Sequence, residues 1–347
     1  MTDINNILDS MPDLDISISS SDAISLQESE LIYIEGIDPR VKLLSHSSRG
    51  TLHKCPRKFQ LYRLNSTMQD AEDNDISNSY QQLTFDFGTC VGMGIQGILE
   101  GKSIDSILLE IFLEWNVDVE LRHAKQSKSL AEAIFAVQRF EAIVEQGYLK
   151  DYELLQYNGK PAVELSFRIN LPGGFSYRGY MDVVLRHKIT GEVVVLEDKT
   201  TSYREVNPAQ YKNSGQALGY SIMLDHIAPG LSSYTVLYLV YSAPRKEFLE
   251  LPFEKSSLQR SLWLTGLLID CKHIEMYEDF GAYSMNGDFC YDFYRECEYL
   301  GLCTMSTERL VKPLTQGILE GIEKKEVYDF DFDFNDLVQT QLDKAED

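Results

Sequence analysis

Hydrophobic residues recur along this chain with two different periods. Between 83 and 148 they fall three and four positions apart, most clearly in the runs 108–115 and 131–148, which is the spacing of amphipathic helices. From residue 162 onward they alternate with polar residues, as in half-buried strands, and the sequences PGGFS and KITG separate the runs as hairpin turns would. The first predicted strands are 162–171, 177–187 and 191–199.

Helices and strands are then expected to alternate. Asn207 and Pro208 are residue types that favour the start of a helix, which we expect over 207–224. Two further strands are predicted at 234–242 and 246–253, followed by a helix over about 256–280. This order predicts an α/β fold in which helices flank a small mixed sheet.

The two ends and one internal segment lack this regularity. Residues 1–30 show no sustained period and 65–80 are polar and rich in turn residues, which favours a flexible arm and a loop. Residues 328–338 alternate acidic and aromatic side chains, as either an edge strand or an exposed peptide for a partner's basic groove would.

Three regions follow from these patterns. We predict an acidic flexible arm over 1–40, a folded domain over 41–310 with a helical insertion at 83–150, and an acidic tail over 311–347. The acidic ends are candidate contacts for a protein partner.

Charge is distributed unevenly over these regions. The 347 residues include 54 Asp and Glu against 32 Lys and Arg, a formal charge of −22, which excludes a protein that coats nucleic acid indiscriminately. The ends carry −8 over 1–40 and −6 over 328–347, whereas 41–64 carries +6 and no carboxylate. This basic segment is either a local anion site or a chance cluster on a solvated helix.

Membrane and secretion signals are missing from the sequence. No stretch approaches the roughly 18 apolar residues that cross a bilayer, and the first ten residues do not resemble a signal peptide. We therefore expect a cytoplasmic protein, in the host cytoplasm if viral, without a membrane partner.

Three ionisable residues are predicted to meet at one end of the sheet. Asp182 lies in one predicted strand, and Glu197 and Lys199 close the next. Because strand side chains alternate, Glu197 and Lys199 share a face and Asp198 is expected to point away. Two carboxylates with room for water suit Mg²⁺ or Mn²⁺, and a nearby lysine can orient water or stabilise charge on phosphorus. The alternative is a surface salt bridge on an exposed hairpin.

The motifs around these residues carry a family resemblance. The chain reads G-Y-M-D at 179–182, L-E-D-K-T at 196–200 and Q-A-L-G-Y at 216–220. From about 45 to 305 it resembles the RecB-like branch of the PD-(D/E)XK nuclease superfamily, which includes phage exonucleases and CRISPR-associated adaptation nucleases. The resemblance implies a PD-(D/E)XK core and a metal-dependent DNA nuclease, expected to act as an exonuclease on ends or single strands in phage or bacterial replication and recombination.

The same resemblance implies residue roles. Asp182 and Glu197 would bind Mg²⁺ or Mn²⁺, Lys199 would be the catalytic lysine, and Gln216 and Tyr220 would line the DNA path. The position between the acid and the lysine of the motif, often apolar in the family, is Asp198 here.

One position departs from the family pattern. The family usually adds an upstream histidine in a G-x-x-(V/I)-H string, and Gly92 stands at that place in Gly88-Thr89-Cys90-Val91-Gly92. The departure puts a second metal in doubt and favours the alternative of a weak or inactive nuclease-like subunit that binds DNA ends or serves in assembly. A third alternative is an acidic protein that mimics DNA. One helical turn later, Gln96 is placed to line the same site, and Glu164 is interpreted as a surface carboxylate.

The cysteines form a further candidate site. In a reducing cytosol structural disulfides are not expected, and the C-x6-C-x5-C spacing of Cys290, Cys297 and Cys303 lacks the C-x2-C pairs of a zinc ribbon. These three plus the distant Cys55 resemble the ligand set of iron-sulfur RecB-like nucleases, which implies a 4Fe-4S cluster that ties the C-terminal segment back. Zinc and unligated core thiols are the alternatives, and Cys90 and Cys271 are expected in the core.

The grouping of Cys55 with the C-terminal cysteines also changes the interpretation of the basic segment 41–64. Cys55 lies within 41–64, and a helix over 49–64 would present Arg49, Arg57 and Lys58 near the mouth of the active site. These three are therefore predicted to contact DNA phosphates.

Overall fold

The computed structural model describes residues 37–64, 76–122, 127–229, 231, 233–292, 295–304 and 328–346. All of them belong to one compact unit, Ile34–Asp347, so the predicted arm over 1–40 lies almost wholly outside the described residues. Within these ranges no helix has both the length and the apolar character needed to cross a bilayer.

The centre of this unit is a mixed eight-stranded sheet, larger than the sequence predicted. Its main strands run in the order β12-β5-β6-β7-β8-β9, and β1 and β2 both pair with β6. Strands β5, β6 and β7 are antiparallel neighbours, β7 and β8 are parallel, and β8 and β9 form an antiparallel hairpin. The bounds are β1 (Leu43–Leu44), β2 (Tyr152–Leu154), β5 (Val163–Asn170), β6 (Ser176–His187), β7 (Val193–Thr201), β8 (Ser233–Ser242), β9 (Glu247–Ser256) and β12 (Phe330–Asp333).

Short elements complete the strand and turn structure. Two small hairpins lie outside the sheet, β3 (Gln156–Tyr157) with β4 (Lys160–Pro161) and β10 (Tyr291–Asp292) with β11 (Arg295–Glu296). Single 3-10 turns occur at η1 (Pro172–Gly174), η2 (Gly287–Phe289) and η3 (Leu300–Leu302). The five strands predicted from the sequence are confirmed to within two or three residues at each end.

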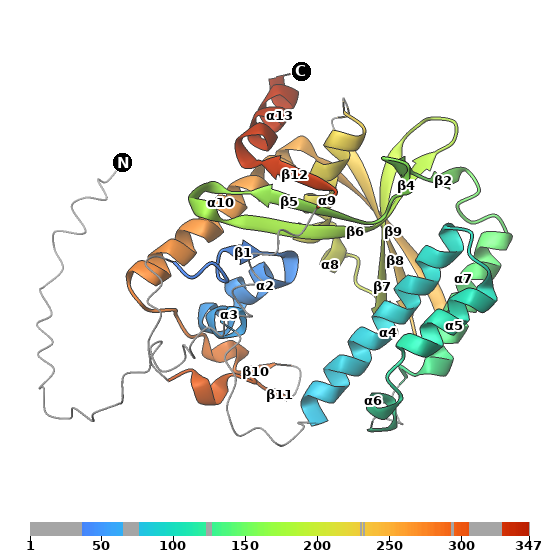
Figure 1. Ribbon diagram of the computed structural model, residues 1–347, viewed down its shortest axis with the longest axis horizontal. Helices are drawn as coiled ribbons and strands as arrows, with labels where there is room; N and C mark the ends of the chain where they lie inside the picture. The colour runs from blue at the N-terminus through green and yellow to red at the C-terminus, as the bar shows by residue number, and fades with distance from the viewer. Residues whose placement is uncertain are drawn as a thin grey trace, which may run out of the picture. The chain divides into compact units, whose positions relative to one another are not determined.

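Helices α2 (His46–Lys54), α9 (Gly215–Ile227) and α10 (Ser257–Asp279) cover one face of the sheet (Figure 1). The helix expected over 207–224 is two helices, α8 (Ala209–Lys212) and α9. The helix expected over 49–64 is also divided, because α3 (Pro56–Arg63) begins with a proline that disfavours the helical conformation of the residue before it. Cys55 is accordingly extended, with φ −154° and ψ 103°.

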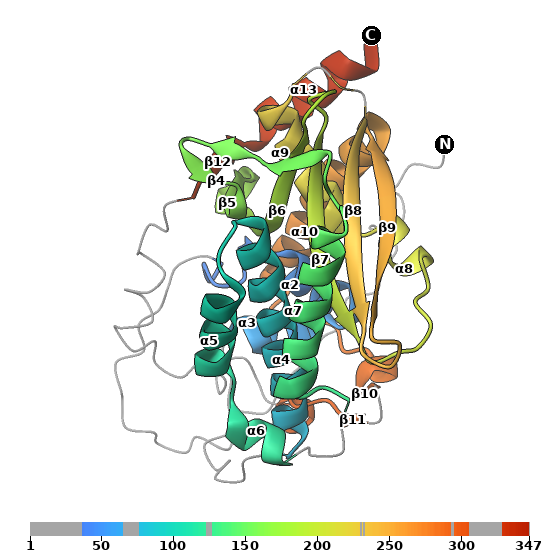
Figure 2. The same cartoon turned by 90° about the vertical axis from the view of Figure 1, so that its right-hand side faces the viewer.

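Helices α4 (Ile76–Leu99), α5 (Ile104–Glu114), α6 (Val117–Arg122) and α7 (Leu130–Glu145) pack against the other face (Figure 2). Helix α4 begins before the predicted end of the 65–80 loop. Close approach of α4 to α7 requires glycine at position 94, since an added Cβ would meet Val137 Cγ2 at 2.2 Å. Gly147 follows α7 with φ +100°, a conformation that glycine adopts without strain.

Residues 328–346 of the predicted acidic tail over 311–347 are folded against the core, and 311–327 lie outside the described residues. Strand β12 pairs in parallel with β5 at the sheet edge, where Phe330 lies opposite Phe167, so the edge-strand interpretation of 328–338 is confirmed for Phe330–Asp333. Helix α13 (Phe334–Glu346) follows directly and packs against α10. The period-two pattern did not predict this helix, which begins at Phe334 within the same stretch. In β12, Asp331 forms an ion pair with Arg168. Binding of a protein partner through the acidic ends stays a prediction.

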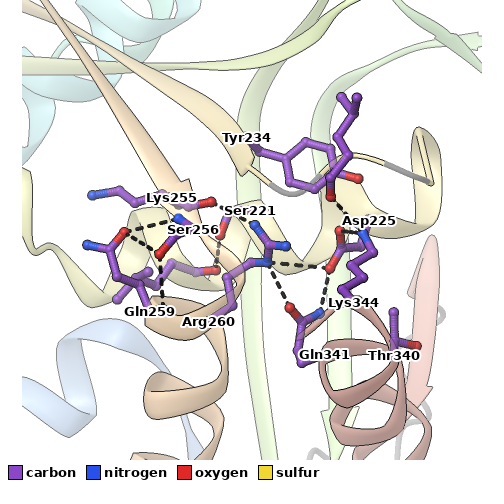
Figure 3. A network of polar contacts seen from close by, with 12 residues as sticks. Ser221, Asp225, Tyr234, Lys255, Ser256, Gln259, Arg260, Thr340, Gln341 and Lys344 are labelled. Carbon is purple, nitrogen blue, oxygen red and sulfur yellow. Dashed lines mark hydrogen bonds and ion pairs between the residues drawn. The ribbon is translucent and has the colours of Figure 1, made fainter. Parts of the chain in front are cut away.

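A buried polar network holds α13 in place (Figure 3). The two oxygens of Asp225 on α9 accept from Lys344 Nζ and, at 2.5 Å, from Gln341 Nε2. Arg260 on α10, fully buried, lies 3.4 Å from Asp225 and donates from Nε to Gln341 Oε1 at 3.0 Å. Since these groups come from α9, α10 and α13, the network fixes the C-terminal helix to the core.

Candidate active site

A pocket of about 500 Å³ lies between α4 and the sheet where β5, β6 and β7 lie side by side. The strands contribute Glu164, Asp182, Asp198, Lys199 and Thr200, and α4 contributes a stripe of small and polar residues that includes Gly88, Gly92 and Gln96. The structure thus brings Asp182 and Lys199, both predicted site residues, to one cavity. Glu164, expected at the surface, and Asp198, expected to point away, line the same cavity.

An irregularity in the β5–β6 ladder shapes this cavity. The paired positions are Val163 with Val183 and Leu165 with Met181, which leaves Glu164 and Asp182 between two rungs. Glu164 has φ +50°, which is uncommon for a residue with a Cβ and occurs often at functional sites. Gln96 Nε2 donates to Glu164 Oε1 at 2.6 Å. Gln96 therefore lines the site as expected, and Glu164, although exposed, lines it as well.

Asp198 is the site residue that sequence reasoning missed. Its backbone N–H donates to Asp182 Oδ2 at 3.0 Å, and its side chain lines the same pocket. The expected alternation along β7 is present, but the β6–β7 ladder ends at the pair Val183 and Leu196. Asp182 lies just beyond this last pair. Its side chain can therefore approach the end of β7 and contact residues on both faces of that strand. An acid at a position that is often apolar in the family was the available signal.

Glu197 and Lys199 form an ion pair next to this pocket, and Lys199 is also one of the residues that line it. Lys199 Nζ contacts Glu197 Oε1, and Glu197 is completely buried. Its other oxygen, Oε2, is also buried and has no hydrogen-bond partner among the described residues. An unpaired buried carboxylate oxygen is costly, so this atom marks a place where a proton or a cation is needed.

The pKa values reflect the same crowding of charge. Burial, together with the charge of Asp198, raises the pKa of Asp182 well above its ordinary value. Burial also raises the pKa of Asp198 to about 6 and that of Glu197 to about 8. Burial alone would lower the pKa of Lys199, but the charges of Glu197 and Asp182 outweigh it and raise that pKa. The protein concentrates more negative charge here than its one lysine neutralises.

Comparison with known proteins assigns the chain to a family. The profile of the PD-(D/E)XK nuclease superfamily matches residues 43–304, a span that contains β5, β6, β7 and the whole pocket. The chain belongs to the PD-(D/E)XK nuclease superfamily. The predicted fold class is thereby confirmed, and membership of this superfamily supports a nuclease.

Two solved structures resemble this superfamily member. A candidate exonuclease from Eubacterium rectale is 11% identical, with 83% of this chain and 95% of that chain covered and a TM-score of 0.42. The structure of SSO0001 is 13% identical, with coverages of 69% and 74% and a TM-score of 0.28. At these scores the two structures add no argument about activity. A comparison with curated proteins finds no match.

The third superfamily motif lies directly behind the acidic site. Gln216 Nε2 donates to Tyr220 Oη at 2.6 Å, and Tyr220 is 3% exposed. Burial and the charges of Glu197 and Asp182 raise the pKa of Tyr220. Tyr220 is thus buried close enough to these carboxylates to sense their charge. That Gln216 and Tyr220 line the DNA path stays a prediction.

The basic residues expected at the mouth of the nuclease site have partners within the fold. Arg49 Nε contacts Asp270 Oδ2 at 2.5 Å, and Lys58 lies 3.4 Å from Glu298. Arg57 is only 6% exposed, which differs from the predicted surface position. Its Nη1 contacts Gln60 Oε1, another buried group of α3. Contact of these residues with DNA stays a prediction.

The four cysteines of the predicted cluster come near one another. Burial and the neighbouring thiols of Cys297, Cys55 and Cys290 raise the pKa of Cys303. Backbone hydrogen bonds join the segments that carry them, as from Cys297 N to Cys290 O at 2.8 Å. Across the described part of the chain, no three or more His, Cys, Asp or Glu side chains are arranged to hold a metal. The cysteines are free thiols, with Cys90 and Cys271 buried as expected.

Proposed function

We propose that the protein is a divalent-metal-dependent deoxyribonuclease that acts on DNA ends or single strands, as in phage or bacterial replication and recombination. The observation that supports this is the meeting of Asp182, Asp198 and Lys199 in one pocket at the end of paired strands. Membership of a nuclease superfamily supports the reaction class.

The residues present fit a divalent cation. Asp182 and Glu197 are the proposed ligands, and Glu197 Oε2 is a buried oxygen that lacks a hydrogen-bond donor among the described residues. Mg²⁺ is commonly held by one or two carboxylates, water and substrate phosphate, so two acids suffice even though no cluster of three is preformed in the described residues. When bound, the ion would polarise the scissile phosphate and lower the pKa of water.

The chain's own groups supply the remaining functions. Lys199, about one third exposed and held by Glu197, presents a cation at the pocket wall. Because its pKa is raised, Lys199 remains protonated at neutral pH and is suited to orienting water and stabilising charge on phosphorus, not to removing a proton. Tyr220, braced by Gln216, supports the carboxylates from behind.

Removal of divalent metal is expected to stop DNA degradation completely. The carboxylates repel one another and the phosphate unless a cation joins them. The measurement is hydrolysis of end-labelled single- and double-stranded DNA with Mg²⁺ or Mn²⁺, beside the same reactions in EDTA. Degradation that continues unchanged in EDTA would contradict the proposal. Binding of DNA ends without hydrolysis under any metal would favour the inactive subunit that Gly92 suggests.

We propose in addition that Cys55, Cys290, Cys297 and Cys303 hold a 4Fe-4S cluster, with Zn²⁺ as the alternative ion. Four thiolates are a donor set that suits either group by its chemistry, although the described side chains are not already arranged around a metal position. Protein purified without oxygen is expected to be brown, with broad absorption in the visible blue, and Cys297→Ala should bleach it. Cys90→Ala, outside the set, should leave the colour unchanged. A colourless preparation with stoichiometric zinc would assign the site to zinc.

A further inference from the structure

Two unusual positions of this chain face each other across the pocket. Gly92 on α4 stands where the family usually has histidine, and Asp198 on β7 stands where it often has an apolar residue. A Cβ added to Gly92 would lie 3.2 Å from both carboxylate oxygens of Asp198. The carboxylate therefore occupies the space into which a side chain from position 92 would project.

The Asp198 carboxylate is also joined to the proposed metal ligand Asp182. The backbone N–H of Asp198 donates to Asp182 Oδ2, which holds the two residues together in one pocket wall. A second observation is independent of this pair. Glu197, wholly buried, carries an oxygen without a hydrogen-bond donor among the described residues, and its carboxyl interacts with that of Asp182. Asp182 thus interacts with both acids of β7, and one lysine neutralises only part of their negative charge, so a bound cation would balance the remainder.

We propose that Asp198, together with Asp182, binds the divalent cation on the α4 side of the site and replaces the side chain that α4 lacks at Gly92. This inference rests on the proposed function in taking the ion to be a catalytic Mg²⁺ or Mn²⁺. It deepens that function, because a carboxylate in place of an imidazole changes which ions the site prefers. Oxygen ligands suit Mg²⁺ and Mn²⁺, whereas imidazole suits Zn²⁺ and other transition metals.

The first test measures Mn²⁺ binding in the absence of DNA, by electron paramagnetic resonance of the free ion. Asp198→Asn keeps the backbone N–H that Asp182 accepts but removes a charged ligand, so the affinity is expected to fall by at least about 10-fold, the lower range for loss of a supporting group at a metal site. Asp151→Asn, which removes the same charge from an exposed position outside the pocket, should leave the affinity unchanged.

A second test relocates the ligand. In the double variant Gly92→His with Asp198→Asn, the imidazole enters from α4 the space next to the altered residue 198. Mn²⁺ binding is expected to recover in part, with a competition preference moved toward Zn²⁺ relative to the wild type. Unfolding curves without metal, recorded for each variant, identify any loss of fold.

The outcomes separate the inference from the proposed function. Wild-type affinity in folded Asp198→Asn would overturn the inference, even if the protein degrades DNA. A different outcome is that Asp198→Asn loses Mn²⁺ binding while the wild-type protein hydrolyses no DNA. That outcome would support the cation site and refute the nuclease proposal. An unchanged metal preference in the double variant would show that position 92 does not reach the ion and would count against the inference.

Discussion

Replacement of Lys199 by alanine is expected to reduce the rate of Mg²⁺-dependent DNA hydrolysis by about 10²- to 10³-fold, the usual cost of removing one preorganised donor to a developing negative charge. Lys199 is the lysine of the pocket and is oriented by the buried Glu197. Burial raises the pKa of Glu197 and the charge of Lys199 opposes that effect, so loss of this cation raises the pKa further and favours the neutral carboxyl. The measurement is the initial rate on end-labelled DNA at saturating Mg²⁺.

The control for this variant is Lys160→Ala, which removes an equal charge from an exposed position on β4. It should retain the wild-type rate. Circular dichroism of Lys199→Ala should match the wild type, since a neutral Glu197 can remain buried. Undiminished hydrolysis by folded Lys199→Ala would remove the catalytic lysine from the assignment.

Replacement of Asp225 by alanine is expected to lower the free energy of unfolding by about 3–5 kcal/mol, the range for breaking a buried ion pair from one side. Asp225 is 6% exposed and accepts from Gln341 and Lys344, and Arg260 lies beside it without access to solvent (Figure 3). Without the carboxylate, a buried guanidinium would lose its counter-charge and α13 would lose two contacts to α9. Denaturant unfolding monitored by fluorescence measures the change.

Asp343→Ala provides the matched comparison on α13. Asp343 is exposed and accepts only from Gln339 on the same helix in the described structure, so its removal should change the unfolding free energy by no more than about 0.5 kcal/mol. A similarly small effect for Asp225→Ala would mean that apolar packing alone holds the C-terminal helix.

Sequence reasoning predicted where the candidate site lies because its signal is local. Asp182, Glu197 and Lys199 follow from strand alternation and from motif order, and the structure brings Asp182 and Lys199 to one pocket. Asp198 was placed away from the site, since alternation predicts faces and does not predict where a ladder ends. The irregular pairing at Glu164 depends on the backbone conformation of two neighbouring strands, which has no signature in either strand alone.

In the C-terminal region, too, a local sequence pattern did not predict structure that depends on distant residues. The period-two pattern at 328–338 correctly indicated an edge strand, but the following helix is short and rich in acids, and it depends on tertiary partners such as Arg260. In the basic segment, charge counts could not indicate that Arg57 would be buried, because burial depends on the bend at Cys55 and on what packs against it.

The sequence by itself therefore predicted the order of the main helices and strands, the superfamily and the central acidic and lysine residues of the candidate site. These depend on periodicity and on short motifs, which act over a few neighbouring positions. Only the tertiary structure decided that Gly92 faces Asp198, that Asp182 contacts residues beyond its own face, and that the acidic C-terminus docks on the core. Each of these is a contact between segments far apart in the chain, fixed by close packing that no local pattern records.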